Sequence, residues 1–394
     1  MAASAMGKSA LLLYLVSCLF RRLSSSSSLL DTAHRVLDPP DSTTSDRLQA
    51  RASPNTRLRR AFGLTNTFVD ADPAIHGRFV RAATRFLNRA RNWEELRGAA
   101  DIATHATLRN VGSVAPYADV VQEATLRFVL AGLLNIDTLS GSEEETALIR
   151  RATSLITELW VRSKLEHLRD QDRLDELNAI LRQLMPDTEA FPNPLDWVIP
   201  TWETMWRVIA IALAHVVADD AARAALLAFH KDPTPSQFTH RATSDSPAVS
   251  DIVEEALRLH PPTRHIYRLV SQPSIFARIF PVPVLRALGI PTHTARNEVA
   301  DIAGLQRSSV WDSPDEWDPL RHEPGRRTAG QAATLMAFGH GRNACVARAW
   351  APMAAGVLMA GIVRGMEVRW VVGRGAKMGG REGWDGWCVR EVEE

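Results

Sequence analysis

The chain has 394 residues and a nearly balanced charge, because 46 basic and 45 acidic side chains give a formal net charge of +1. Hydrophobic residues make up 45% and charged residues 23%, which excludes a mostly disordered chain and a polytopic membrane protein. A near-zero charge without a basic block argues against a nucleic-acid partner. Three cysteines without a C-x-x-C pair exclude a disulfide framework and argue against a structural zinc site.

The N-terminal run from Ser9 to Phe20 is uncharged and mostly apolar, with Lys8 before it and Arg21 after it. As a helix it reaches about 18 Å, which is short of the roughly 30 Å hydrocarbon core of a bilayer. We expect residues 1–30 to form an apolar segment with a Ser-rich spacer that acts as a short membrane anchor. A signal-like segment, an interfacial segment and a disordered leader remain alternatives. Residues 31–60 are expected to form a polar leader without a core pattern.

From about Phe62 the chain becomes dense in apolar residues at helical spacing. Asp72 followed by Pro73 is a helix start signal, because Asp caps free N–H groups and Pro suits the first turn. The spacing predicts helices over residues 73–91, 93–109, 116–135, 143–185 and 202–230, and short strands over 266–270, 368–372 and 388–392. Since no repeat or Gly/Ser linker interrupts it, residues 61–394 are predicted to form one domain, mainly α with small β-sheets.

The most informative segment covers residues 338–345, FGHGRNAC, and an apolar run follows it from Ala349 to Val363. Two glycines close together predict a tight turn ahead of Cys345. A thiolate ahead of a helix is stabilised by free N–H groups and by the helix dipole, which suits a metal-bound sulfur. A buried, unreactive cysteine in a turn is the alternative.

This segment resembles the haem-binding loop of the cytochrome P450 family, the haem-thiolate monooxygenases. The resemblance implies that Phe338 packs against the haem, that Gly341 permits the turn and that Cys345 is the axial ligand of the iron. A cysteine thiolate of this kind favours cleavage of the O–O bond.

An upstream E-x-x-R is formed by Glu255 and Arg258, whose i, i+3 spacing puts both charges on one helix face. Residues 166–169 and 323–326 match the same pattern, but only Glu255 and Arg258 are followed by a diproline stop. The segment 311–321, WDSPDEWDPLR, looks like the family stretch that lies between this helix and the cysteine loop. The resemblance implies that Arg321 completes a buried structural triad, which serves folding and haem loading. A surface salt bridge is the alternative.

Residues 199–207, IPTWETMWR, resemble the family's distal helix, which crosses the haem. There Glu203 and Thr204 would be the catalytic pair that relays protons to bound oxygen. A structural alternative is that the Thr hydroxyl bonds the carbonyl of the preceding turn.

Several positions depart from the family pattern. Asn343 stands where the family has a basic residue for a haem propionate, so Arg264 and Arg268 are the better candidates, with Arg342 as a third. Pro352 is expected to disturb the helix behind the thiolate. The haem-contacting helix at the front is assigned to either of two segments: Trp93 to Arg97, or the basic segment with His76, Arg78, Arg81 and Arg85. We expect the segment that precedes this front helix to be shortened, because it lacks the β-rich portion that the resemblance implies at the N-terminal side.

The resemblance thus implies a cytochrome P450 fold that holds haem b and oxidises an apolar small molecule with O2. Electrons would come from a separate NADPH-cytochrome P450 reductase. The sequence style looks like filamentous-fungal members, many of which act in secondary metabolism. An isomerase or dehydratase of the same fold, or a haem-binding remnant without catalysis, are the alternatives. We expect location on the cytosolic face of the endoplasmic reticulum membrane, with the cytoplasm as the alternative.

Overall fold

The structure is a computed structural model, and it describes residues 25–136, 141–165, 170–274, 281–367 and 369–392. The apolar run from Ser9 to Phe20 lies outside these residues. The larger helices are α2 (Ser25–Leu37), α3 (Thr44–Ala52), α4 (Thr56–Phe62), α5 (Pro73–Arg89), α6 (Trp93–Arg109), α7 (Tyr117–Phe128), α8 (Glu143–Arg162), α9 (Gln171–Leu184), α10 (Leu195–Val216), α11 (Asp220–Lys231), α13 (Val249–Leu259) and α18 (Ala351–Met366).

Short helices and two small sheets complete the fold. The strands are β1 (Val114–Pro116), β2 (His265–Pro273), β3 (His293–Asp301), β4 (Trp370–Gly373) and β5 (Cys388–Glu391). The short helices are α12 (Pro235–Phe238), α15 (Val282–Ala287), α16 (Ile302–Gln306), α17 (Ala329–Thr334), the π-helical turn η2 (Val129–Leu133) and the 3-10 turns η1 (Ser53–Asn55), η3 (Pro319–His322) and η4 (Gly341–Asn343).

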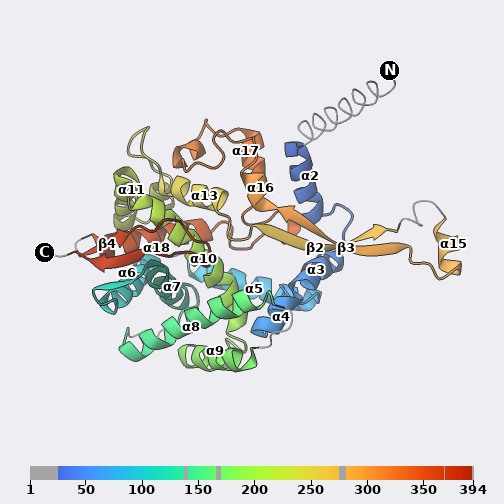
Figure 1. The fold of residues 1–394 in the computed structure, drawn as a ribbon, viewed down its shortest axis with the longest axis horizontal. Coiled ribbons are helices and arrows are strands. Elements are labelled where there is room, and N and C mark those ends of the chain that lie inside the picture. Colours follow the sequence, from blue (N-terminus) through green and yellow to red (C-terminus); the bar gives the residue numbers. More distant parts are fainter. Residues whose placement is uncertain (1–24, 137–140, 166–169, 275–280, 368, 393–394) are drawn as a thin grey trace, which may run out of the picture.

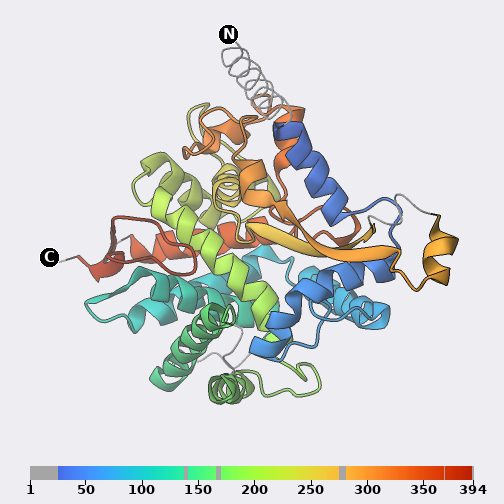
Figure 2. The ribbon, with the colours of Figure 1, turned by 45° about the vertical axis from the view of Figure 1, so that its right-hand side comes forward.

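Helix α10 runs through the middle of the molecule, and α7, α13 and α18 pack against it (Figure 1, Figure 2). Small residues permit a close approach of α18 to α6: a Cβ on Gly361 would lie 3.1 Å from Cβ of Ala100, and one on Gly365 would lie 2.6 Å from Thr104. These helices supply most of one continuous hydrophobic core. The predicted fold class, mainly α with small sheets, is therefore confirmed.

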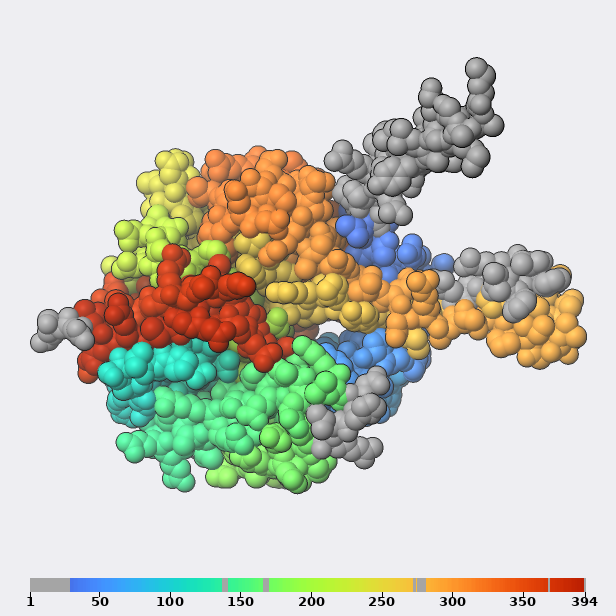
Figure 3. Space-filling view, in the orientation of Figure 1, coloured from blue at the N-terminus to red at the C-terminus, as the bar shows by residue number. Residues whose placement is uncertain are grey.

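The five strands form two separate sheets. Strands β1, β5 and β4 form one antiparallel sheet, and β2 pairs with β3 from His265 opposite Asp301 to Pro273 opposite His293. The β2–β3 hairpin carries α15 at its far end and projects from the body of the molecule (Figure 3). All three predicted strand segments are present, whereas β1 and β3 were not predicted.

Residues 31–60 are not the polar leader that we expected from their sequence. Helices α2 and α3 bury apolar side chains, with Val36 at 1% and Leu48 at 0% exposure, and α2 packs on β3 as part of a second, smaller core. Helix α3 begins with a capping box between Thr43 and Asp46. The Ser-rich segment, expected to be a spacer, becomes helical at Ser25.

Other helices differ from the prediction mainly at their ends. Asp72 caps α5 by accepting a hydrogen bond from the Ala74 N–H, as the sequence indicated. The predicted helix over 143–185 is two helices, and the one predicted from 202 begins already at Leu195, because Pro200 is accommodated inside α10. Among the described helices, none is both long and apolar enough to cross a membrane.

Candidate functional site

The loop that carries Cys345 is a tight turn held by backbone hydrogen bonds. The Cys345 N–H donates to the Phe338 carbonyl at 2.8 Å, and the Ala344 N–H donates to the Gly341 carbonyl at 3.1 Å. Gly341 has a φ of 68°, in the left-handed region that favours glycine. Phe338 is half-buried against the main core. The loop thus has the form that the sequence predicted.

The same loop is fastened to the N-terminal segment between α2 and α3. Arg342 donates from Nε to Oδ1 of Asp38 at 2.7 Å, and its other nitrogens donate to the carbonyls of Pro39 and Ser42. This contact joins residues 304 positions apart. All three nitrogens of the Arg342 guanidinium thus donate to this segment, and its role in binding the cofactor stays a prediction.

Cys345 itself is an exposed free thiol at the end of this loop. Desolvation by the surrounding backbone raises the pKa of the thiol, while a hydrogen bond from the Ala347 N–H and the charge of Arg348 act in the opposite direction. A metal ion that binds here must therefore displace a proton. Helix α18 begins only at Ala351, so its dipole acts on the sulfur from further away than we expected. Pro352 lies in the first turn, where no N–H is needed, and does not disturb the helix.

A buried charged network surrounds Glu255 on α13. Arg258 donates two hydrogen bonds to its carboxylate, at 2.7 and 2.8 Å, and Arg321 Nε lies 3.2 Å from Oε1. The structure thus brings the three predicted triad residues together. Glu255 and Arg258 are 0% exposed, which excludes the alternative of a surface salt bridge.

Sequence reasoning missed His322, the fourth member of this network. Its Nε2 lies 2.8 Å from Glu255 Oε2, and its Nδ1 lies 3.2 Å from Glu254. Burial alone would raise the pKa of Glu255, but hydrogen bonds from Arg258 and His322 and the charge of Arg258 lower it to about 2. Burial lowers the pKa of His322, yet the two carboxylates outweigh it and raise that pKa. Only its position directly after Arg321 could have pointed to it.

Arg258 also fixes the segment that leads to the cysteine loop. It donates to the carbonyls of Gln306, Pro314 and Glu316, and its guanidinium lies 5.2 Å from the centre of the Trp311 ring. The Gln306 side chain in turn accepts from the Met336 N–H, two residues before Phe338. The network therefore determines the path of the chain up to the thiolate loop.

Helix α10 is buried except for one stripe of side chains. The partly exposed positions of this stripe are Asp196, Trp197, Pro200, Thr201, Thr204, Arg207 and His215. Thr201 donates to the Trp197 carbonyl at 2.6 Å, whereas the Thr204 hydroxyl makes no hydrogen bond to any described residue. The back-bonding alternative thus applies to Thr201 and not to Thr204, which is partly exposed.

Glu203 is placed differently from Thr204. It is 2% exposed and accepts a hydrogen bond of 2.8 Å from Arg381 Nε, which comes from the C-terminal segment. Its Oε2 has no hydrogen-bond partner among the described residues. The predicted pair therefore consists of one free hydroxyl and one carboxylate already held by an arginine, and Arg381 was not found from the sequence.

Two buried arginines, and one amide in the cysteine loop, could pair with an anionic group. Arg268 is 9% exposed and Arg51 is 7% exposed, and neither has a carboxylate partner among the described residues. Burial lowers the pKa of Arg268 to about 10, and the nearby charge of Arg51 adds to this. Nδ2 of Asn343, two residues before Cys345, is buried without a hydrogen-bond partner in the described part of the chain. Unpaired buried cations of this kind suit the propionates of a haem. Arg264, by contrast, is exposed.

Of the two candidate front helices, α5 lies with the buried arginines. Nδ1 of His76 is 2.9 Å from the Thr67 hydroxyl, to which Arg51 also donates. Burial, together with the charges of Arg51 and Arg47, lowers the pKa of His76. Helix α6 instead packs along α18, and its Arg97 pairs with Glu94. This favours the segment that contains His76.

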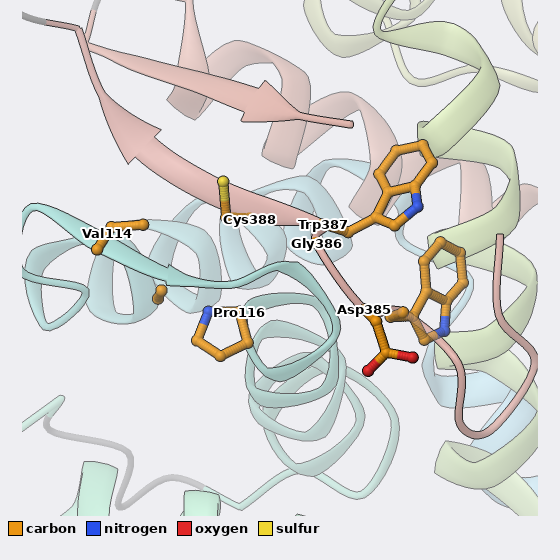
Figure 4. Close-up of a pocket in the computed structure, with 8 residues that line it drawn as sticks. Val114, Pro116, Asp385, Gly386, Trp387 and Cys388 are labelled. Atoms are coloured by element: carbon orange, nitrogen blue, oxygen red, sulfur yellow. The ribbon is translucent and has the colours of Figure 1, made fainter. Parts of the chain in front are cut away.

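A hollow of roughly 440 Å³ lies elsewhere, at the sheet of β1, β5 and β4. Trp384, Trp387 and Cys388 line it together with Pro116 (Figure 4). None of the predicted site residues lies there. Within the described ranges, no cluster of three His, Cys, Asp or Glu residues is arranged to hold a metal ion.

Comparison with known proteins shows similarity to one protein family over part of the chain. The cytochrome P450 family model matches residues 224–377. The sterol 14-alpha demethylase CYP51A of Gibberella zeae is 28% identical over 34% of this chain, and cytochrome P450 4A24 of Sus scrofa is 25% identical over 49% of it. The chain covers only 28% and 38% of the length of these two relatives.

Solved structures show the same fold over more of the chain. The heme domain of a cytochrome P450DA mutant matches with a TM-score of 0.61 and 18% identity, covering 88% of this chain and 83% of that one. A 6-coordinated cytochrome P450 from Thermus thermophilus matches with a TM-score of 0.58 and 14% identity, covering 88% and 87%. At these identities the likeness concerns the fold, which is that of P450 heme domains.

Proposed function

We propose that the chain is a member of the cytochrome P450 family, whose model matches residues 224–377, and that it is a haem-thiolate monooxygenase whose haem b is held by Cys345. The family implies haem with a cysteine thiolate on the iron. The observation that carries the proposal is the loop from Phe338 to Cys345, a tight turn that ends in an exposed thiol. When bound, the haem supplies the chemistry of O2 activation, favoured by the electron-rich thiolate.

The protein's own residues hold such a group from two sides. The Ala347 N–H hydrogen bond to the sulfur stabilises its thiolate form. Arg268 and Arg51 provide positive charge for carboxylates, and the Asn343 amide provides a further donor. The exposed Arg264 is not part of this donor set. This donor set fits the haem propionates without the basic residue that the family usually has at position 343.

The buried network keeps the loop in place. The Glu255 carboxylate neutralises Arg258, which fixes the carbonyls of the segment from Gln306 to Glu316. Arg321 and His322 occupy the remaining side of the carboxylate. We assign these residues to folding and haem loading, since none is exposed to a substrate.

Proton delivery falls to Thr204, with Glu203 behind it. A free hydroxyl on the open stripe of α10 can donate a proton and accept another from the interior. Glu203 lies one residue away, and it must loosen its contact with Arg381 before it can carry a proton. That contact also favours the alternative, an isomerase or dehydratase of the same fold that needs no such relay.

The finer parts of the proposal follow from the family resemblance. We assign the supply of electrons to an NADPH-cytochrome P450 reductase. We expect the substrate to be an apolar small molecule and the reaction to belong to secondary metabolism. The apolar run from Ser9 to Phe20, which has Lys8 before it and Arg21 after it, supports attachment to the endoplasmic reticulum membrane. These assignments apply to the whole protein.

The test is turnover by the purified haem protein with the reductase, NADPH and isotopically labelled dioxygen. We expect one labelled oxygen atom in the product and NADPH consumption that requires substrate. Conversion of a hydroperoxide without NADPH would support the isomerase or dehydratase instead. Haem binding without either reaction, across a substrate panel, would leave a non-catalytic remnant.

A further inference from the structure

Two arginines contact Glu203, and two further arginines lie close to these two. The basic cluster consists of Arg57 on α4, Arg207 on α10, Arg264 before β2 and Arg381 in the C-terminal segment. Arg381 and Arg57 lie over the ring of Trp160, with distances of 4.3 and 5.7 Å from guanidinium carbon to ring centre. Burial lowers the pKa of Arg207 to about 10, and the positive charges of Arg381 and Arg264 act in the same direction, which places Arg264 in the neighbourhood of Arg207.

The cluster holds more positive charge than its surroundings neutralise. Glu203 is its one carboxylate partner among the described residues, and Arg381 occupies Oε1 of that group. Arg207 reaches the same oxygen only at 3.7 Å, and its own Nε is buried without a hydrogen bond to any described residue. Arg57 donates to the Ser163 hydroxyl instead of a carboxylate. A guanidinium that is mostly removed from water without an anion is unfavourable, so the cluster is suited to receive one.

Near the N-terminus of α10, aromatic side chains lie on the same stripe. Trp197 stacks on Phe79 of α5 with ring centres 5.0 Å apart, and Phe86 meets it edge-on at the same distance. All three rings are half-buried. From Trp197 to Arg207 the helix rises about 15 Å, with Thr204 between the two. Along its length, one face of α10 thus offers first an aromatic surface at Trp197, then the hydroxyl of Thr204 and then the positive charge of Arg207.

We propose that the substrate is an amphiphile, an apolar chain with a carboxylate that the basic cluster binds through Arg207 and Arg264 while the chain lies against Trp197 and Phe79. This inference rests on the proposed function, because the proposed function is what assigns the substrate to this stripe of α10. Arginine suits a carboxylate because its planar fork donates two parallel hydrogen bonds. The aromatic surface accounts for the apolar part of the molecule.

The experiment compares three probes with the same alkyl chain on the purified haem protein: dodecanoate, dodecanol and dodecyltrimethylammonium, all below micellar concentrations. Binding is measured by isothermal titration calorimetry and by the shift of the Soret band. We expect dodecanoate to bind about tenfold or more tightly than dodecanol, as a charge-assisted hydrogen bond provides. The cationic probe should bind most weakly. Equal affinities for the acid and the alcohol would overturn the proposal.

Two variants locate the effect. Arg207→Gln should reduce the preference for dodecanoate over dodecanol to near unity. Arg264→Gln changes an exposed residue that has no carboxylate partner in the described part of the chain, so it should fold normally and reduce the preference severalfold. Arg364→Gln is the matched control, because this exposed arginine on α18 pairs with Glu367 and lies outside the cluster. A preference that survives both cluster variants would also contradict the assignment.

Failure of this inference is separable from failure of the proposed function. Calorimetry needs no signal from the haem, so it reports the preference for an anion whatever the iron ligand is. Turnover with labelled dioxygen reports the monooxygenase, whatever the head group of its substrate.

Discussion

Replacing Glu255 by Gln removes the negative charge on which Arg258, Arg321 and His322 converge, and it keeps the size of the side chain. The pKa of Glu255 is lowered from its ordinary value of 4.5 to about 2 in the folded protein. At roughly 1.36 kcal/mol per pKa unit, the charged carboxylate contributes on the order of 3 kcal/mol to folding at neutral pH. Loss of one partner of a buried ion pair typically costs about 3–5 kcal/mol, which agrees.

We therefore expect Glu255→Gln to lose about 3 kcal/mol of unfolding free energy in urea at pH 7 and to purify with little haem. The matched control is Glu367→Gln on α18, whose partner Arg364 is 56% exposed, so the change should be below about 1 kcal/mol. Because a lowered pKa contributes stability that is lost as pH falls through it, the difference from the parent protein should shrink below pH 4.5. A Glu255→Gln protein of full stability and haem content would refute this reasoning.

Three further predictions concern neighbouring features. His322→Gln should remove a pH dependence: the raised pKa of His322 gives stability that is complete below about pH 6.5 and falls as pH rises above it, so urea titrations from about pH 6 to 9 should show that slope only in the parent protein. Thr204→Val should keep the haem spectrum but release peroxide severalfold faster per NADPH, and unchanged coupling would remove Thr204 from the relay. Gly341→Ala should lose about 1–3 kcal/mol, because its φ is positive and a Cβ would collide with Asp38, whereas Gly380→Ala, with open space around it, should be neutral in the same urea titration.

The features that were predictable from the sequence are those with a local signal. Asp72 and Pro73 mark the start of α5 correctly because a cap and a first-turn proline act on adjacent N–H groups. The turn before Cys345 was predictable because glycine is favoured where φ is positive. Glu255 and Arg258 were predictable as a pair because i, i+3 spacing on a helix brings them together.

The features that were missed depend on contacts between distant residues. Arg342 pairs with Asp38 across 304 positions, and Arg381 pairs with Glu203 across 178. No local pattern indicates either partner, so neither contact could be expected from the sequence. The helices over residues 31–60 were missed for a related reason, since their few apolar residues become a core only when α2 packs on β3.

The central claim, a haem held by the Cys345 thiolate, is tested most directly by the carbon-monoxide difference spectrum of the reduced, purified protein beside its Cys345→Ser variant. The account predicts a strongly red-shifted Soret band for the parent protein and loss of that band in the variant. The same spectrum in both proteins, or a parent band typical of imidazole ligation, would contradict it.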